Sequence, residues 1–344
     1  MICKTATSLA DLVAAGLLPA AAPELAQAEA RLAVAITPTM LELIDRNDPA
    51  DPIALQFVPQ AQELTTTPEE RADPIGDAAY SPLSGIVHRY PDRVLLKLLH
   101  ACPVYCRFCF RHEQVGPQGG VLGAAELEAA LRYIEQHPAI WEVILSGGDP
   151  LMLSDRRLQE VIARLAAIPH VKLLRIHSRV PVVDPQRVTA DLIAALRSRL
   201  PVYLLLHCNH PRELTPEARD ACARMADSGI VLLSQSVLLR GVNADVETLT
   251  TLMRAFVENR IKPHYLHHPD LATGTAHFRV SLEEGQALMR ALRGRLSGLC
   301  QPTYMLDIPG GVGKSPVGPN YATREDAQWR IEDFRGASHA YHDR

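Results

Sequence analysis

Lysine is scarce in this chain of 344 residues, and so is any excess of charge of one sign. The formal net charge is −4 and is spread along the chain, so the basic surface by which proteins bind nucleic acid is not expected. No apolar run reaches the roughly 18 residues that a membrane helix needs. Because Asp11 interrupts the apolar N-terminal stretch, we expect an amphipathic helix there and no signal peptide. We therefore expect a cytoplasmic protein that has no membrane partner.

Seven cysteines are present, and their distribution argues against a framework of disulfide bonds. Their number is odd, and three of them fall within residues 102–109. Closely spaced cysteines outside a secreted framework more often bind metal or take part in redox chemistry. The four others are predicted to be small buried apolar residues: Cys3, Cys208, Cys222 and Cys300.

Short apolar runs alternate with amphipathic helical patterns in the larger part of the chain. One such helix is predicted at 154–167, and Ser281 with Glu284 forms a capping box before another. Parallel strands are joined by crossovers that need a helix, so six β-then-α units in succession predict a parallel sheet. The strands are expected at 94–100, 142–148, 172–179, 202–209, 231–239 and 262–268, and a seventh could follow at 302–309.

Such a sheet is either open and doubly wound, or closed fully or partly into a barrel. A doubly wound fold would usually carry a glycine-rich phosphate turn after its first strand, where this chain has cysteines. Polar side chains end the strands, which is where barrel enzymes hold their chemistry. We therefore expect an α/β fold, a partial TIM-type (β/α)6 barrel over 76–300, with an N-terminal helical extension over 1–75 and a short C-terminal segment over 301–344.

Three cysteines, Cys102, Cys106 and Cys109, follow the first predicted strand with the spacing CxxxCxxC. Thiolates suit iron–sulfur clusters or zinc, and a structural zinc site needs four protein ligands. Zinc held with a nearby histidine (His100 or His112) and cysteines without any metal are the alternatives to a cluster. Three thiolates would leave one iron of a [4Fe–4S] cluster open to a molecule with amino and carboxylate groups. The loop closely resembles the motif of radical S-adenosylmethionine (SAM) enzymes.

A glycine turn, Ser146-Gly147-Gly148-Asp149, follows the second predicted strand. Glycine lets the backbone approach a ligand closely, although a plain tight turn is the alternative at this position. Because the turn comes after a cysteine loop, it resembles the glycine element that contacts the methionyl amino group in radical SAM enzymes.

One of the few lysines, Lys314, ends a glycine-rich loop that begins at Asp307. The spacing of DIPGGVGK does not fit a phosphate-binding P-loop, and no clear helix follows it. A lysine on a mobile glycine loop can instead form a Schiff base, which is the chemistry that pyridoxal phosphate (PLP) requires.

The order of these motifs resembles the lysine 2,3-aminomutase family. CxxxCxxC, SGGDP and DxPGGxGKxPxxPNY occur in that order, with HRYPDR at 88–93 and HxNHPxELT at 207–215. The resemblance extends from about residue 75 to residue 322. Long members of the family carry further metal-binding cysteines near the C-terminus, and this chain has none after Cys300. It is therefore similar to the short branch that supplies (R)-β-lysine for the modification of elongation factor P.

The resemblance implies an isomerase that moves the α-amino group of L-lysine to C3, giving β-lysine, through a PLP aldimine and a 5′-deoxyadenosyl radical. It implies three cofactors: a [4Fe–4S] cluster, SAM and PLP. The implied partners are a small amino-acid substrate and an electron donor such as flavodoxin or ferredoxin, and a homo-oligomer is compatible with it.

The family's functional residues can be carried over position by position. The lysine that bonds PLP matches Lys314, and the residues that help to hold PLP match Arg89, Tyr90 and Arg93. The substrate carboxylate would be bound by Arg111, and its ε-ammonium by Asp270 and Asp307, since a buried cation needs counter-charge. The expected SAM-binding residues are Ser146, Gly147, Gly148, Asp149, Arg179, His207 and Gln235.

The chain departs from the family near the expected substrate pocket. His112 stands where a second arginine is usual, and His267, His268 and Pro269 stand where the family has an aromatic and small residues. Two alternatives therefore remain beside lysine isomerisation. One is the same chemistry on another amino acid or in the service of elongation factor P, and the other is a metal-binding relative without catalysis.

Overall fold

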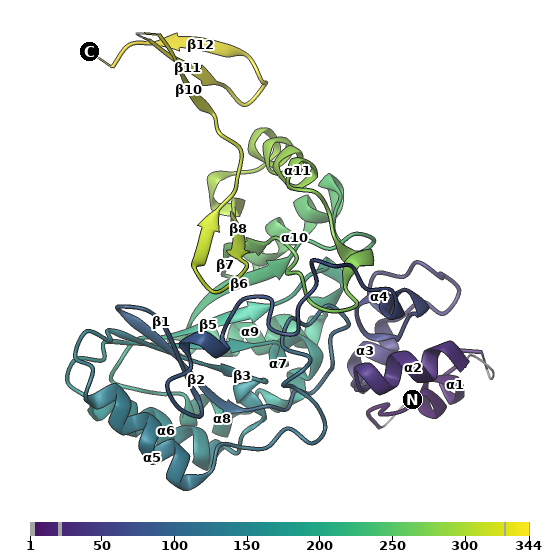
Figure 1. Ribbon diagram of the computed structural model, residues 1–344, viewed down its shortest axis with the longest axis vertical. Coiled ribbons are helices and arrows are strands. Elements are labelled where there is room, and N and C mark those ends of the chain that lie inside the picture. Colours follow the sequence, from purple (N-terminus) through teal and green to yellow (C-terminus); the bar gives the residue numbers. More distant parts are fainter. Residues whose placement is uncertain (1–3, 20–22, 327, 344) are drawn as a thin grey trace.

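The computed structural model describes residues 4–19, 23–326 and 328–343, and its main feature is a nine-stranded sheet curled into an open barrel (Figure 1). The strands lie side by side in sequence order, with β2 to β8 parallel and β1 and β9 antiparallel at the two edges. They are β1 (Ile86–Tyr90), β2 (Arg93–Leu99), β3 (Glu142–Gly147), β4 (Leu173–Ser178), β5 (Val202–His207), β6 (Val231–Val237), β7 (Ile261–His267), β8 (Thr303–Ile308) and β9 (Gly313–Pro316).

The seven apolar runs of the sequence become the seven parallel strands, so the predicted partial barrel is confirmed. The buried apolar side chains of these strands explain why they could be recognised, although β4 and β6 alternate between buried and partly exposed positions. The sequence did not predict β1 and β9, which are short and contain charged residues. Both matter for the site, because β1 carries part of the HRYPDR segment and β9 carries Lys314.

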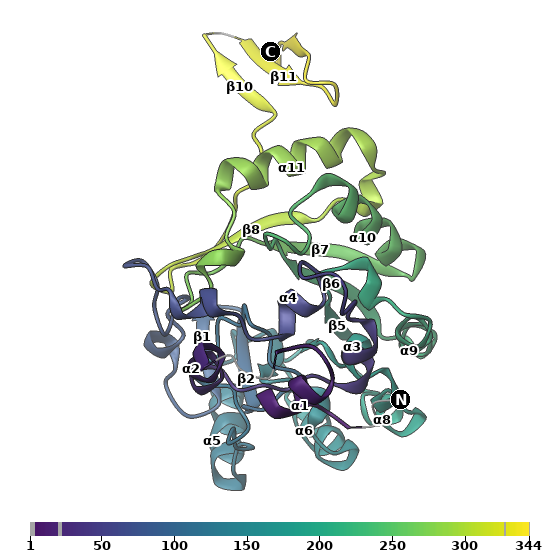
Figure 2. The ribbon, with the colours of Figure 1, turned by 90° about the vertical axis from the view of Figure 1, so that its right-hand side faces the viewer.

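Helices follow the strands and pack on the outer side of the curled sheet (Figure 2). The helix expected at 154–167 is α6 (Asp155–Ala167), and the hydroxyl of Ser154 accepts the N–H of Arg157 at its start. The capping box of Ser281 and Glu284 begins α11. The helices are α5 (Ala124–Glu135), α6, α7 (Val180–Val183), α8 (Ala190–Ala195), α9 (Pro216–Asp227), α10 (Val246–Glu258) and α11 (Leu282–Arg295).

The N-terminal region is helical, as expected, and lies beside the barrel (Figure 1). Its α-helices are α1 (Leu9–Ala14), α2 (Pro23–Arg31), α3 (Pro38–Leu43) and α4 (Ala54–Phe57), followed by the 3-10 turns η1 (Ala61–Leu64) and η2 (Ala78–Tyr80). Of the cysteines predicted to be buried, Cys208, Cys222 and Cys300 are buried, and Cys3 lies outside the described residues. Among the described residues, no helix has both the length and the apolar character to cross a membrane.

The nine-stranded sheet continues past residue 300 through β8 and β9, and a separate body begins only at residue 322. There β10 (Ala322–Glu325), β11 (Gln328–Glu332) and β12 (Ser338–Tyr341) form a three-stranded antiparallel sheet. It projects away from the barrel (Figure 1). No such sheet was predicted, because the segment is mostly polar and shows no clear apolar alternation.

One buried arginine fastens the N-terminal region to the cysteine loop. Arg107 lies between two of the cysteines, and its guanidinium forms an ion pair with Glu63 of η1. The same guanidinium donates hydrogen bonds to the carbonyls of Ala28, Leu32 and Ala33. Both charged side chains are excluded from water, so each depends on the other for counter-charge.

The substitution Glu63→Gln is expected to destabilise the protein strongly, because it leaves the Arg107 guanidinium buried without a counter-charge. Removing one partner of a buried pair costs roughly 3–5 kcal/mol of unfolding free energy. Urea unfolding measures this. Glu128→Gln is the matched control, because it breaks an ion pair with Arg164 at the surface and should leave the unfolding curve unchanged. Equal effects of the two substitutions would contradict this account of Arg107.

Candidate active site

A cavity of about 440 Å³ lies at the carboxyl ends of the parallel strands. All the site residues expected from the sequence line this one cavity, although they come from elements far apart in the chain. They are Arg89, Tyr90, Arg93, Cys102, Cys106, Cys109, Arg111, Ser146, Gly147, Gly148, Asp149, Arg179, His207, Gln235, Asp270, Asp307 and Lys314.

The cysteine loop follows β2 and is held by backbone contacts with the N-terminal region. The N–H of Tyr105 donates to the carbonyl of Ala35, and the N–H of Arg107 donates to that of Gln56. His112, a departure from the family pattern, bonds through its ring Nδ1 to the carbonyl of Cys109, 2.6 Å away. A carbonyl only accepts, so this contact requires the proton on Nδ1. These bonds fix an irregular segment that has no strand or helix of its own.

The three thiols are suited to metal-bound thiolates. Burial raises the pKa of Cys102, of Cys106 and of Cys109, so free thiolates would be costly in this place without a cation. Among the described residues, no three His, Cys, Asp or Glu side chains converge tightly enough to bind a single metal ion. A [4Fe–4S] cluster needs no such convergence, because each thiolate binds a different iron.

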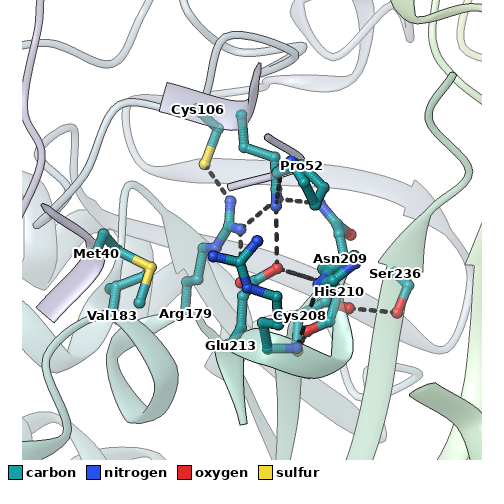
Figure 3. A network of polar contacts seen from close by, with 12 residues as sticks. Met40, Pro52, Cys106, Arg179, Val183, Cys208, Asn209, His210, Glu213 and Ser236 are labelled. Carbon is teal, nitrogen blue, oxygen red and sulfur yellow. Dashed lines mark hydrogen bonds and ion pairs between the residues drawn. The ribbon is translucent and has the colours of Figure 1, made fainter. Parts of the chain in front are cut away.

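Arg179 carries positive charge to the cysteine loop from the end of β4. Its Nη1 donates to the Sγ of Cys106 at 2.8 Å, and its Nη2 donates to the carboxylate of Glu213 at 2.7 Å (Figure 3). Nη2 also donates to the side-chain oxygen of Gln56 in α4 at 2.6 Å. The guanidinium therefore links the cysteine loop, the N-terminal region and the turn after β5.

The glycine turn after β3 packs directly under the cysteine loop. A Cβ on Gly148 would come within 2.1 Å of the carbonyl oxygen of Ala101, so only glycine fits there. The N–H of Gly148 donates to Leu99 and that of Asp149 to Ala101. Glycine is therefore required in this turn because two backbone segments approach each other closely there.

Asp149 makes its hydrogen bonds within the protein. Its carboxylate accepts from the hydroxyl of Ser178 at 2.8 Å and from the N–H groups of Leu151, Arg179 and Val180. These donors join the glycine turn to the end of β4. The side chain lines the cavity, but its main contacts fix the loop that surrounds it.

Lys314 reaches the cavity from β9, and β1 holds it there. The N–H of Lys314 donates to the phenol oxygen of Tyr90 at 2.7 Å, and its Nζ forms an ion pair with Asp307 of β8. Arg89 of β1 lies with Nη1 3.8 Å from the other carboxylate oxygen of Asp307. The two edges of the open sheet therefore meet through side chains. Arg93 stacks on the Tyr90 ring, with its guanidinium 3.8 Å from the ring centre.

Asp270 and Asp307 form an acidic pair deep in the cavity. Burial and the charge of Asp307 raise the pKa of Asp270 to about 7, against the opposing effect of Lys314 and Arg111. His267 lies with Nδ1 3.9 Å from Asp307. Burial and the Lys314 charge lower the pKa of His267, so this histidine is neutral and leaves the acidic pair open to another cation.

Arg111 is held by a carboxylate that sequence reasoning missed. Its Nε and Nη2 donate to one oxygen of Asp77, at 3.2 and 2.9 Å, and its Nη1 lies 3.5 Å from the hydroxyl of Ser146. Asp77 belongs to residues 67–80, which we call the strap. The strap crosses from Leu271 to the turn at Gly310, and Ile75 and Asp77 line the cavity. The sequence of this loop, which is rich in proline and aspartate, did not indicate that one of its carboxylates would hold Arg111.

Further inward-facing residues of the strands complete the cavity. Among them are Arg175, His177, His264 and Tyr265, none of which was predicted. Alternation along β4 could have indicated Arg175 and His177, which are two residues apart. His264 and Tyr265 are adjacent, and both line the cavity where the pairing of β7 with β6 is irregular, which alternation does not predict. His207, which was predicted, packs edge-to-face against Phe108, and burial lowers its pKa to about 3. The histidine side chains that line the cavity are therefore neutral and polar.

The cavity has polar atoms left for a ligand. Several buried side-chain atoms without a hydrogen-bond partner among the described residues belong to its lining: Nε of Arg89 and Arg179, Nε2 of His177 and His207, and Oδ1 of Asp307. Buried polar groups are normally paired, so this concentration fits a site built for polar, charged molecules.

Comparison with known proteins agrees with this geometry. A family model described as the Radical SAM superfamily matches residues 96–252. The L-lysine 2,3-aminomutase of Acetoanaerobium sticklandii is 43% identical, over 90% of this chain and 75% of its own length. The L-lysine 2,3-aminomutase of Escherichia coli is 37% identical over 83% of each chain. The glutamate 2,3-aminomutase of Clostridioides difficile is 38% identical over 83% of this chain and 68% of its own.

Membership of the radical SAM superfamily implies a [4Fe–4S] cluster and SAM as cofactors, and the three thiols of the cysteine loop fit that cluster. The identities with these aminomutases extend over 90% and 83% of this chain. The chain therefore belongs to the lysine 2,3-aminomutase family of radical SAM isomerases.

Proposed function

We propose that this enzyme moves the α-amino group of L-lysine to C3 and releases β-lysine. The observation that carries the proposal is the acidic pair of Asp270 and Asp307, which lines the same cavity as Arg111. Two carboxylates suit one terminal ammonium, and a guanidinium suits a carboxylate. Lysine carries both groups at its two ends.

The position of Lys314 supports the assignment of an ammonium to this end of the cavity. Its Nζ contacts Asp307 directly, in a position where the side chain of Asp307 is nearly excluded from water. A substrate with a second carboxylate, such as glutamate, would face repulsion from the pair. Since one relative is named a glutamate 2,3-aminomutase, identity alone does not choose between the substrates, and the charge of this end of the cavity favours lysine.

Lys314, Arg89, Tyr90 and Arg93 would hold PLP. The fit is supported by the buried Nε of Arg89, which has no hydrogen-bond partner among the described residues. When bound, the cluster with SAM would supply a radical that abstracts hydrogen, and PLP would supply a conjugated carbon that carries the amino group while it moves from C2 to C3 of the substrate. The chain's own residues orient the substrate by its two ends and keep water out of a buried cavity.

The cysteine loop would bind the cluster through Cys102, Cys106 and Cys109, and the glycine turn with Arg179, His207 and Gln235 would surround SAM. Arg179 can stabilise thiolate charge on Cys106, because its Nη1 already donates to that sulfur. Delivery of electrons by flavodoxin or ferredoxin, a homo-oligomeric state and a role in elongation factor P modification remain predictions from the resemblance.

The proposal is tested with protein purified without oxygen and supplied with iron, sulfide, PLP, SAM and a reductant. We expect β-lysine from L-lysine and much slower conversion of L-glutamate, because the acidic pair repels its second carboxylate. Mass spectrometry of the products from a panel of amino acids measures this. Absence of a 3-amino product from every amino acid, or faster conversion of glutamate, would overturn the proposal.

The variant Lys314→Ala is the control for that assay. It should keep iron and sulfide at the level of the unmodified protein, since Lys314 lies on β9 and not on the cysteine loop. It should also lose the visible absorbance of bound PLP and all measurable turnover. Retention of PLP absorbance in this variant would show that another residue bonds the cofactor.

The affinity for lysine is expected to fall as the pH drops below about 7. The pKa of Asp270 is about 7 in the free cavity, so below it the carboxyl is protonated, and the ε-ammonium must displace a proton in order to bind. The dissociation constant should therefore rise about tenfold for each pH unit below that value. Calorimetric titration of lysine at several pH values measures it.

Norleucine, which is lysine without the ε-amino group, is the matched ligand for this prediction. Its affinity should not depend on the protonation of Asp270. In Asp270→Asn, the pH dependence of lysine binding should disappear. An equal pH dependence for lysine and norleucine would refute the assignment of Asp270 to the ε-ammonium.

A further inference from the structure

Asp77 is a buried acidic residue of the cavity whose position joins two sites that the proposed function keeps apart. It lies on the strap, at the first residue before η2, and its side chain is 4% exposed. One of its carboxylate oxygens accepts from Arg89 Nη2 at 2.9 Å, and the other accepts from Arg111 Nε and Nη2. Arg89 is expected to serve PLP, and Arg111 the substrate carboxylate.

Contacts of the strap hold Asp77 in place, and Arg89 adds one by donating from Nη2 to the carbonyl of Ile75 at 2.7 Å. The N–H of Asp77 donates to the carboxylate of Asp73 at 2.9 Å, and Gly76 packs against the turn of Gly310 and Gly311. The hydroxyl of Ser81 donates to the Asp77 carbonyl. The carboxylate is therefore presented from a turn that is held by several hydrogen bonds and by close packing against the glycine loop.

Asp77 is the carboxylate that Arg89 and Arg111 share. Arg89, Arg111 and the buried Lys97 surround it, and they hold the pKa of its carboxyl below the usual range despite burial. Arg89 also lies 3.8 Å from the carboxylate of Asp307, whereas Arg111 forms its ion pair with Asp77. A phosphate at Arg89 or a carboxylate at Arg111 would therefore compete with Asp77 for the arginine that it binds.

We propose that Asp77 is a positioning residue that couples cofactor binding at Arg89 to substrate binding at Arg111. This inference rests on the proposed function, because it takes the two arginines as the sites of the PLP phosphate and the substrate carboxylate. Asp77 occupies the Nε–Nη2 edge of Arg111, which leaves Nη1 on the side of Ser146. It shares its charge between the two guanidiniums.

Because Asp77 shares its charge between the two arginines, the direction of the coupling between substrate binding and PLP binding can be predicted. When a ligand carboxylate draws the charge of Arg111 to itself, or when Arg111 is removed, Asp77 neutralises Arg89 more completely. Arg89 then attracts a phosphate less strongly, and the affinity for PLP falls. With asparagine at position 77 there is no negative charge to redistribute. A substitution or a bound ligand at Arg111 should then no longer change the affinity of Arg89 for a phosphate.

A double-mutant cycle on PLP binding tests the coupling without any turnover. Arg111→Met in the otherwise unmodified protein should raise the PLP dissociation constant about tenfold, as expected for charged groups in contact. The same substitution combined with Asp77→Asn should change that constant less than twofold relative to Asp77→Asn alone. Absorbance titration of the cluster-loaded protein with PLP measures all four constants, and iron content checks that each variant is folded.

A ligand can replace the Arg111 substitution if that variant does not fold. The compound 6-aminohexanoate has the carboxylate and the terminal ammonium of lysine but no α-amino group. It should weaken PLP binding in the unmodified protein and leave it unchanged in Asp77→Asn. Glu70→Gln is the matched control, because Glu70 lies on the same strap and pairs with Arg279 instead of the cavity arginines. It should preserve the coupling.

Equal effects of Arg111→Met, or of 6-aminohexanoate, with and without Asp77 would overturn the inference. So would loss of the coupling in Glu70→Gln, because that would trace the effect to the shape of the strap. If the unmodified protein itself fails to bind PLP, the proposed function fails and not merely the coupling. The two failures are therefore distinguishable in one experiment.

Discussion

The buried guanidinium of Arg179 is the contact on which the arrangement of this site depends. It lies between the Sγ of Cys106, the carboxylate of Glu213 and the side chain of Gln56, so three separate parts of the chain meet at one charge (Figure 3). A charge so far from water is tolerated only with such partners. The cysteine loop has no secondary structure of its own, and this contact, together with the Arg107–Glu63 pair, gives it a fixed place.

The second constraint is the topology of the sheet. Because the strands lie in sequence order, β1 and β9 end up at opposite edges of an open barrel. Contacts between Tyr90 and Lys314, and between Arg89 and Asp307, join those edges. The lysine loop from the end of the chain is thereby brought to the HRYPDR segment and to the cavity that the cysteine loop borders. Residues more than two hundred positions apart thus share one site.

Much of this could be predicted from the sequence, for identifiable reasons. The seven parallel strands carry buried apolar side chains, and the site motifs carry unusual combinations of Cys, Gly and Lys that few other structures require. The role of Asp77 could not be predicted, because it arises from the path of an irregular strap across the barrel. Asp149 was expected to face a ligand, and the hydrogen bonds to its carboxylate depend on the neighbouring β4, which no local pattern reveals. The sheet of β10 to β12 also escaped prediction, because few of its residues are buried.

The central claim is that the cysteine loop and Lys314 serve a single cavity. The most direct measurement is a crystal structure of the loaded enzyme, with iron located by its anomalous scattering and PLP and lysine by their density. The account predicts iron against the Sγ atoms of Cys102, Cys106 and Cys109, PLP against Lys314, and lysine between them with its ammonium at Asp270 and Asp307. Iron or PLP located outside this cavity, or lysine bound in the reverse direction, would contradict it.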